Sequence, residues 1–263
     1  MTLSAKEKQV LDQLKEHLAV IAAGHPAVEI GETYEEAELC FQAMACCKLL
    51  RAADKAGFQK YLFWTGLTRR YFLERSKDEG GQNDFRRARS RSEGFFCAAA
   101  AGDIPLALEI SALSPTRWMK KGEYEEDFAY HEFLSVTLGG AEEAEREASL
   151  KRFDKALKGD ASARYDVCQA LQEGDGAAFE QAFQELCERN ASEQLKERPE
   201  FADTATFEPR SRVFTEGFAL VRIAESRGIR VPKQPFPLCP ETGRVGLLRR
   251  RPDDLFAEMA GLQ

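Results

Sequence analysis

Two side chains in the sequence have the spacing of an acid–base pair. Asp127 and His131 lie four residues apart, so on one helix they would face each other. A carboxylate that orients a histidine is a common arrangement for general-base catalysis. No nucleophile accompanies them, however, and an ordinary pair on a helix surface explains the same spacing. We therefore expect no catalytic residue here, and an enzyme that uses this pair is the weakest of the functional hypotheses.

The sequence lacks the motifs that hold metals and cofactors. Only three histidines occur, and neither C-x-x-C nor H-E-x-x-H is present, so a zinc site is not expected. The glycine-rich phosphate-binding patterns and the G-x-S-x-G pattern of hydrolases are also absent. We expect no metal and no cofactor.

The cysteines are odd in number and scattered among alanine and leucine residues. This pattern is typical of reduced thiols that pack as small hydrophobic side chains in the cytoplasm. Cys46 and Cys47 are adjacent, so they would point about 100° apart on a helix and would not readily chelate one ion together. The seven are Cys40, Cys46, Cys47, Cys97, Cys168, Cys187 and Cys239.

Acidic residues outnumber basic ones by 44 to 37, and their densest cluster is the candidate binding surface. The net charge of -7 argues against a general nucleic-acid binder. Carboxylates crowded on one short segment repel one another, and a basic protein partner would relieve that repulsion, with aromatic side chains as anchors. A solvated helix face is the alternative interpretation. The candidate partner-binding residues are Glu123, Tyr124, Glu125, Glu126, Asp127 and Tyr130.

Basic residues are concentrated between positions 69 and 91, where eight basic and four acidic residues occur. An arginine-rich helix here could bind RNA, but the nearby phenylalanines fit a core stripe better than a stacking platform. We expect these arginines to lie on a solvated helix face.

These residues must be positioned by helices. Ala and Leu total 62 residues and Val and Ile only 15, a ratio that favours helix over strand. Two tracts of about 80 residues contain no proline, the strongest helix breaker. The sequence predicts an all-α fold, a single domain over residues 1–263 built as an irregular stack of antiparallel helical hairpins, with about ten helices and a proline-rich irregular segment at 231–252.

The expected helices follow from apolar spacing and end signals. Residues 39–50 are apolar on nearly every side except at Gln42 and Lys48, so this helix should be central and buried, with Phe41, Met44, Ala45 and Leu49 inside. A polar loop is expected at 196–209. The expected ranges are 4–22, 34–53, 58–76, 84–101, 104–114, 124–138, 141–157, 161–173, 177–189 and 210–227.

Gly-Asp pairs separate several of these helices. Glycine suits the left-handed residue after a helix, and aspartate suits the N-cap of the next one. We therefore expect Asp103, Asp160 and Asp175 to cap helices and not to bind metals or take part in catalysis. The pairs are 57 and 15 residues apart, which is not the fixed period of a repeat array.

Two groups of segments together resemble the immunity protein 49 family. The first comprises residues 95–107, with Gly102-Asp103, and residues 113–115. The second runs from residues 170–175, with Gly174-Asp175, through Ala178-Phe179 to the helix at residues 218–229. The resemblance covers roughly residues 30 to 240. Its motifs have low specificity, because Gly-Asp turns occur in many helical proteins.

The resemblance implies a helical antitoxin of bacterial polymorphic-toxin and type VI secretion systems. Such a protein is not an enzyme, and it neutralises a cognate secreted toxin by direct binding. The alternative is a helical-repeat scaffold that binds a protein or peptide partner, although the irregular Gly-Asp spacing weakens it. The N-terminus lacks the pattern of a secretory signal, and no apolar stretch approaches 18 residues, so we expect a cytoplasmic protein that uses neither membrane nor nucleic acid.

Overall fold

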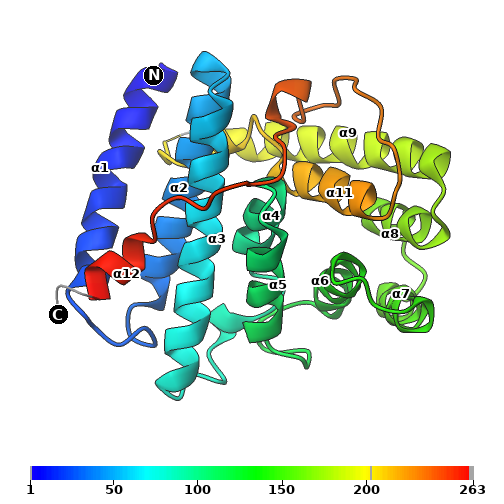
Figure 1. The fold of residues 1–263 in the computed structure, drawn as a ribbon, viewed down its shortest axis with the longest axis horizontal. Coiled ribbons are helices and arrows are strands. Elements are labelled where there is room, and N and C mark those ends of the chain that lie inside the picture. Colours follow the sequence, from blue (N-terminus) through cyan, green and yellow to red (C-terminus); the bar gives the residue numbers. More distant parts are fainter. Residues whose placement is uncertain (1, 202, 261–263) are drawn as a thin grey trace.

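The computed structural model describes residues 2–201 and 203–260, and this part of the chain is built from α-helices without any strand (Figure 1). The all-α prediction is therefore confirmed. Two 3-10 turns, η1 (Phe85–Arg87) and η2 (Glu241–Gly243), interrupt the connections. The helices are α1 (Leu3–Ala22), α2 (Gly31–Ala52), α3 (Lys55–Asp78), α4 (Glu93–Ala100), α5 (Ile104–Leu113), α6 (Glu125–Leu138), α7 (Glu143–Leu157), α8 (Ala163–Glu173), α9 (Gly176–Phe201), α10 (Phe207–Arg210), α11 (Thr215–Ser226) and α12 (Leu255–Ala260).

Helix α2 is the centre of the N-terminal half. It packs against α1, α3 and α10, which explains why its sequence is apolar on nearly every side. Phe41, Met44, Ala45 and Leu49 are each at most 4% exposed, so the prediction that residues 39–50 form a buried core helix is confirmed.

The α4–α5 hairpin adds to the same layer, and its turn depends on Gly102. That residue has a φ of +78°, and a Cβ added to it would lie 2.6 Å from the Gly246 carbonyl oxygen. Glycine is therefore required both for the backbone conformation and for the close approach of the C-terminal segment. The adjacent Asp103 accepts a hydrogen bond from the amide of Leu106 at 3.0 Å and caps α5, as predicted.

The C-terminal half consists of the α6–α7 and α8–α9 pairs, with α11 packed against α4 and α6. Asp175 caps α9 through the amides of Ala177 and Ala178, as predicted. The prediction for Asp160 is wrong, because the hydroxyl of Ser162 accepts the capping hydrogen bond of α8 from Tyr165.

Three helices differ by more than three residues at one end from the sequence prediction. Helix α11 begins at Thr215 and not at residue 210, because the short helix α10 and a turn precede it. Residues 84–101 do not form one helix, since η1 and a loop occupy residues 85–92 and α4 begins only at Glu93. Helix α9 continues to Phe201 through residues expected to form a loop. Pro199 lies in its last turn, so it removes only one late hydrogen bond, while residues 192–198 are largely good helix formers.

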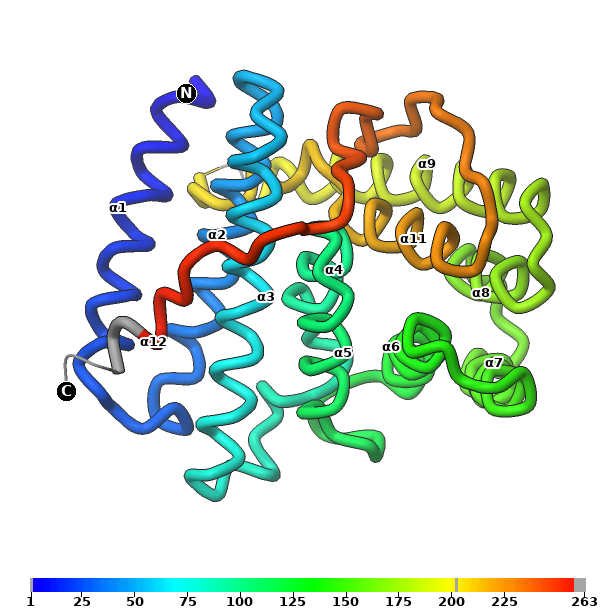
Figure 2. Tube along the Cα trace, viewed as in Figure 1, coloured from blue at the N-terminus to red at the C-terminus, as the bar shows by residue number. Residues whose placement is uncertain are grey.

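The segment after η2 passes the turn of the α4–α5 hairpin, crosses α3 and ends in α12 (Figures 1 and 2). The amide of Leu248 donates to the carbonyl of Gly102 at 3.1 Å, and the ring of Phe256 stacks on Tyr71 with centroids 4.6 Å apart. Arg251 donates two hydrogen bonds to Asp103. In the part of the chain that the structure describes, no helix combines the length and apolarity needed to cross a bilayer.

Candidate functional site

The predicted acidic cluster lies at the N-terminus of α6, which begins at Glu125. Glu125, Glu126 and Asp127 occupy the first turn of this helix, where the exposed backbone amides and the helix dipole favour negative charge. Part of the crowding of carboxylates therefore has a structural explanation.

The structure divides the six predicted residues into outward and inward groups. Tyr124 is 74% exposed, Glu126 is exposed and Glu125 is half-buried. Glu123 instead holds two loops together, since its carboxylate accepts hydrogen bonds from the amides of Ser90 at 2.9 Å and Met119 at 3.2 Å. Tyr130 is fully buried, so the expectation that it could anchor a partner at the surface is corrected.

Asp127 and Tyr130 belong to a network around Arg164 of α8. The guanidinium of Arg164 donates to Asp127 at 3.2 Å and, through two nitrogens, to Glu216 of α11 at 3.0 and 2.8 Å. The hydroxyl of Tyr130 also donates to Glu216, at 2.7 Å, and Arg164 lies over its ring at 4.8 Å from the centroid. The network joins the N-terminal turns of α6, α8 and α11.

Charge and burial shift the pKa values of Arg164, Asp127 and Tyr130 in this network. The carboxylate of Glu216 raises the pKa of Arg164, which therefore stays positively charged. Burial raises the pKa of Asp127, although Arg164 lowers it. Burial and the neighbouring Glu216 raise the pKa of Tyr130 well above its ordinary value, so its hydroxyl remains a donor.

A hollow of about 580 Å³ lies directly beside this network, between α2, α9, α10 and α11. Arg164 and Glu216 form part of its wall. Its floor is polar: the amide of Gln42 donates to Glu93 of α4 at 3.0 Å and to Thr215 at 3.1 Å, and accepts from Arg210 at 3.2 Å.

The hollow is acidic. Glu36, Glu93, Glu197 and Glu216 line it, and among the described residues the carboxylates of Glu36 and Glu197 have no hydrogen bond and no ion pair. Two cations also line the hollow: Arg164 is engaged by Glu216 and Asp127, and Arg210 donates to Gln42. A cationic group that entered the hollow would meet the carboxylates of Glu36 and Glu197, with Arg210 as the competing cation.

The Asp127–His131 pair does not form. Asp127 turns to Arg164, whereas His131 is buried and packs on Phe96 with ring centroids 4.9 Å apart. Burial lowers the pKa of His131 well below its ordinary value. In the described part of the chain, no three His, Cys, Asp or Glu side chains gather closely enough to hold a metal ion, and the seven cysteines are buried thiols.

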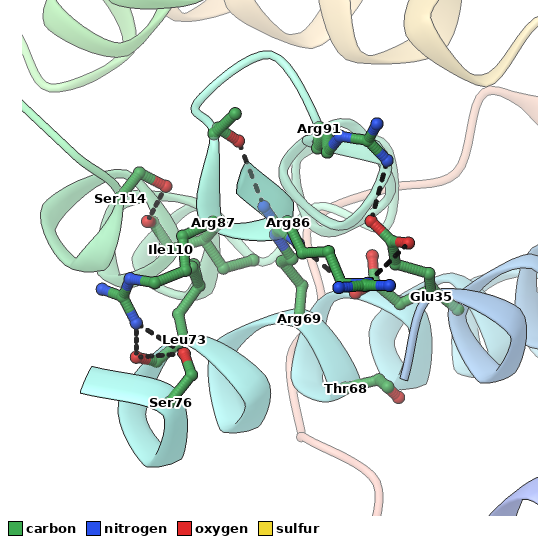
Figure 3. A network of polar contacts seen from close by, with 12 residues as sticks. Glu35, Thr68, Arg69, Leu73, Ser76, Arg86, Arg87, Arg91, Ile110 and Ser114 are labelled. Atoms are coloured by element: carbon green, nitrogen blue, oxygen red, sulfur yellow. Dashed lines mark hydrogen bonds and ion pairs between the residues drawn. The ribbon is translucent and has the colours of Figure 1, made fainter. Parts of the chain in front are cut away.

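The arginine-rich stretch is not a solvated helix face. Figure 3 shows Arg87 reaching Leu73 and Ser76 of α3, while Arg86 and Arg91 approach Glu35 of α2. Arg89 is buried and donates to Ser111 and Ser135 and to the carbonyl of Pro115. These long-range contacts hold residues 85–92 as a loop, which explains why the predicted helix starts late.

Sequence reasoning missed the partners of the acidic cluster. Arg164 and Glu216 lie far from it in sequence, and no local pattern connects the three helices that they join. One signal was present: Gln42 is one of only two polar residues in the apolar segment 39–50, and a buried polar side chain needs a partner. In the structure it bonds Glu93, Thr215 and Arg210.

Comparison with known proteins identifies the family. The family model described as Immunity protein 49 matches residues 18–242. No curated protein and no solved structure matches the chain. Because the match spans most of the sequence, as the resemblance in the Gly-Asp segments implies, the chain belongs to the immunity protein 49 family.

Proposed function

We propose that this protein neutralises a cognate secreted bacterial toxin by binding it directly in the cytoplasm, without catalysing a reaction. Membership of an immunity-protein family supports the general function. The family's association with polymorphic-toxin and type VI secretion systems suggests the source of the toxin.

The observation that carries the proposed binding mode is the cluster of carboxylates at the N-terminus of α6, which lies close to the acidic hollow. Tyr124, Glu125 and Glu126 are at least partly exposed. Asp127 connects them through Arg164 to the acidic hollow. This surface suits a basic region of a toxin, because opposite charges speed the encounter and an exposed aromatic ring supplies apolar contact area.

The hydrogen-bonded junction beneath the surface supports the same proposal. The network of Arg164, Glu216 and Tyr130 fixes the three helix ends before any partner arrives. A preorganised surface loses little conformational entropy on binding. In this proposal Asp127 and Tyr130 position the surface, while Tyr124, Glu125 and Glu126 contact the toxin.

The test starts by tagging the protein in its native cell and identifying, by mass spectrometry, the toxin-domain protein that co-purifies with it. The purified toxin and the protein should form a 1:1 complex in calorimetric titration. Co-production of the protein should restore growth of a host that makes the toxin, and protection should require at least equimolar protein. Protection at far lower ratios, or protection without a complex, would indicate an enzymatic activity and contradict the proposal.

A further inference from the structure

A second surface, next to the acidic one, has the opposite charge. A groove of about 720 Å³ lies between the loop at residues 82–85 and the loop at residues 115–122. Its lining includes the basic residues Arg117, Lys120 and Lys121 and no carboxylate. All three are exposed.

The groove also has an apolar lining. Phe85 is 40% exposed and forms one wall, and Trp118 and Met119 belong to the other. Arg86 and Arg91 lie over the ring of Phe85, 4.6 and 4.8 Å from its centroid, and the ammonium of Lys120 lies 5.4 Å from the Trp118 ring. Aromatic rings are thus held among cations.

The two walls are fixed relative to each other. The indole of Trp118 donates to the carbonyl of Glu123 at 3.0 Å, and the carboxylate of Glu123 binds the amides of Ser90 and Met119. Gly122 packs so closely on Phe85 that an added Cβ would lie 3.1 Å from the Phe85 Cβ. The groove is therefore formed before a ligand binds.

We propose that this groove binds an acidic segment of the toxin that also carries apolar side chains, so that the toxin contacts both surfaces. The inference rests on the proposed function, because it assigns the groove to the same partner. Carboxylates of the segment would pair with Lys120, Lys121 and Arg117, and its apolar side chains would pack on Phe85, Trp118 and Met119. The acidic residues Glu125 and Glu126 next to the groove and the net charge of -7 disfavour a nucleic acid there.

The test uses Lys120→Glu/Lys121→Glu, two changes at exposed side chains. The matched control is Lys8→Glu/Lys55→Glu, which makes the same change in net charge near the N-terminal ends of α1 and α3. Helix α3 starts at Lys55 and ends at Asp78, shortly before the groove, so Lys55 lies roughly 30 Å or more from the groove. Helix α1 begins at the same end of the molecule as α3 (Figure 1). The groove variant should bind the toxin about tenfold more weakly or worse, and the control should bind like the wild type. Equal affinity of the groove variant and the wild type would overturn the inference.

A peptide titration tests the groove separately from the toxin. A fluorescent 12-residue peptide of alternating Glu and Leu should bind the wild type and lose at least about tenfold in affinity with the groove variant. A Lys/Leu peptide should not bind at the groove. Failure of the Glu/Leu peptide to bind would overturn the inference. So would a 12-nucleotide oligouridine that binds at the groove with higher affinity than the peptide. If the wild type binds the peptide but no toxin, the proposed function fails. The assignment of the groove to the toxin then fails as well, but the preference of the groove for acidic peptides stands.

Discussion

Arg164 connects three helices through one side chain, and its removal should leave Glu216 and Asp127 without their cation. Glu216 is only 11% exposed, so the loss of its charged partner is costly. Because Arg164 itself is partly exposed, we expect Arg164→Ala to lower the free energy of unfolding by about 2 kcal/mol. Urea unfolding would measure the change.

Arg152 provides the matched control for this prediction. It pairs with Glu132 at 2.9 Å, but more than half of its side chain is exposed. Arg152→Ala should therefore cost less than about 1 kcal/mol. Equal costs for the two variants would show that the Arg164 network does not stabilise the junction of the three helices.

Glu38 makes the free energy of unfolding depend on pH, and the sign of that dependence can be stated. Burial raises the pKa of Glu38 from 4.5 to about 8, although Arg69, 3.9 Å away, lowers it. Between those two values the folded protein binds a proton that the unfolded chain releases, so the free energy of unfolding should fall as pH rises. Glu38→Gln should reduce this slope between pH 5 and pH 8 in denaturant titrations.

The Glu38 prediction is checked against Thr33→Ala, a change of an uncharged residue on the same helix. That variant should shift the free energy of unfolding by the same amount at every pH. If Glu38→Gln retained the full wild-type slope, Glu38 would not be the titrating group. The carboxyl of Glu38 could not be recognised from sequence, because its burial depends on how α2 and α3 pack.

The three aspartates predicted as helix caps should contribute different amounts to the free energy of unfolding. Asp103 is buried, caps α5 and also binds Arg251 from the C-terminal segment, so Asp103→Ala should cost about 2–3 kcal/mol. Asp175 is an exposed cap, and its replacement by alanine should cost about 1 kcal/mol. Asp160→Ala should cost almost nothing, because Ser162 is the cap there. Thermal unfolding of the three variants should reproduce this order, and a different order would contradict the capping assignments.

Helix α2 carries the most direct test of the core. Phe41 is 1% exposed and its ring lies 5.8 Å from that of Trp64. Phe41→Ala should lower the free energy of unfolding by about 3–5 kcal/mol. Tyr124→Ala removes an exposed ring and should change stability by less than about 0.5 kcal/mol. An unchanged stability for Phe41→Ala would mean that α2 is not the core.

Most helices could be predicted because their signals are local. The apolar residues of α2 and the Gly102-Asp103 pair are short sequence signals, and each lies in the helix or turn that it specifies. The loop at residues 85–92 could not be predicted, because Arg87 and Arg89 fix it through carbonyls and hydroxyls distant in sequence. For the same reason the sequence located the acidic cluster but not which of its members face outward.

At the scale of the whole molecule, the protein presents an acidic surface and a basic, aromatic groove side by side, although its net charge is -7. Glu123 lies between them and is engaged by two backbone amides. An interface with both signs of charge fixes the orientation of a partner as well as attracting it. We expect specificity for one toxin to depend on the two surfaces together.

The central claim is that a basic region of the toxin binds the acidic surface, and the association rate across a salt series tests it most directly. The variant is Glu125→Lys/Glu126→Lys, which leaves Asp127 paired with Arg164. Its control is Glu142→Lys/Glu143→Lys, the same change in charge at the exposed N-terminus of α7.

The charge-reversed α6 variant should associate with the toxin at least about tenfold more slowly than the wild type at low salt. The difference should shrink as the salt concentration rises, because exposed charges are screened beyond about 8 Å at physiological ionic strength. The α7 control should associate nearly as fast as the wild type at every salt concentration. An α6 variant that remains folded and keeps the wild-type association rate and affinity throughout the series would contradict the account.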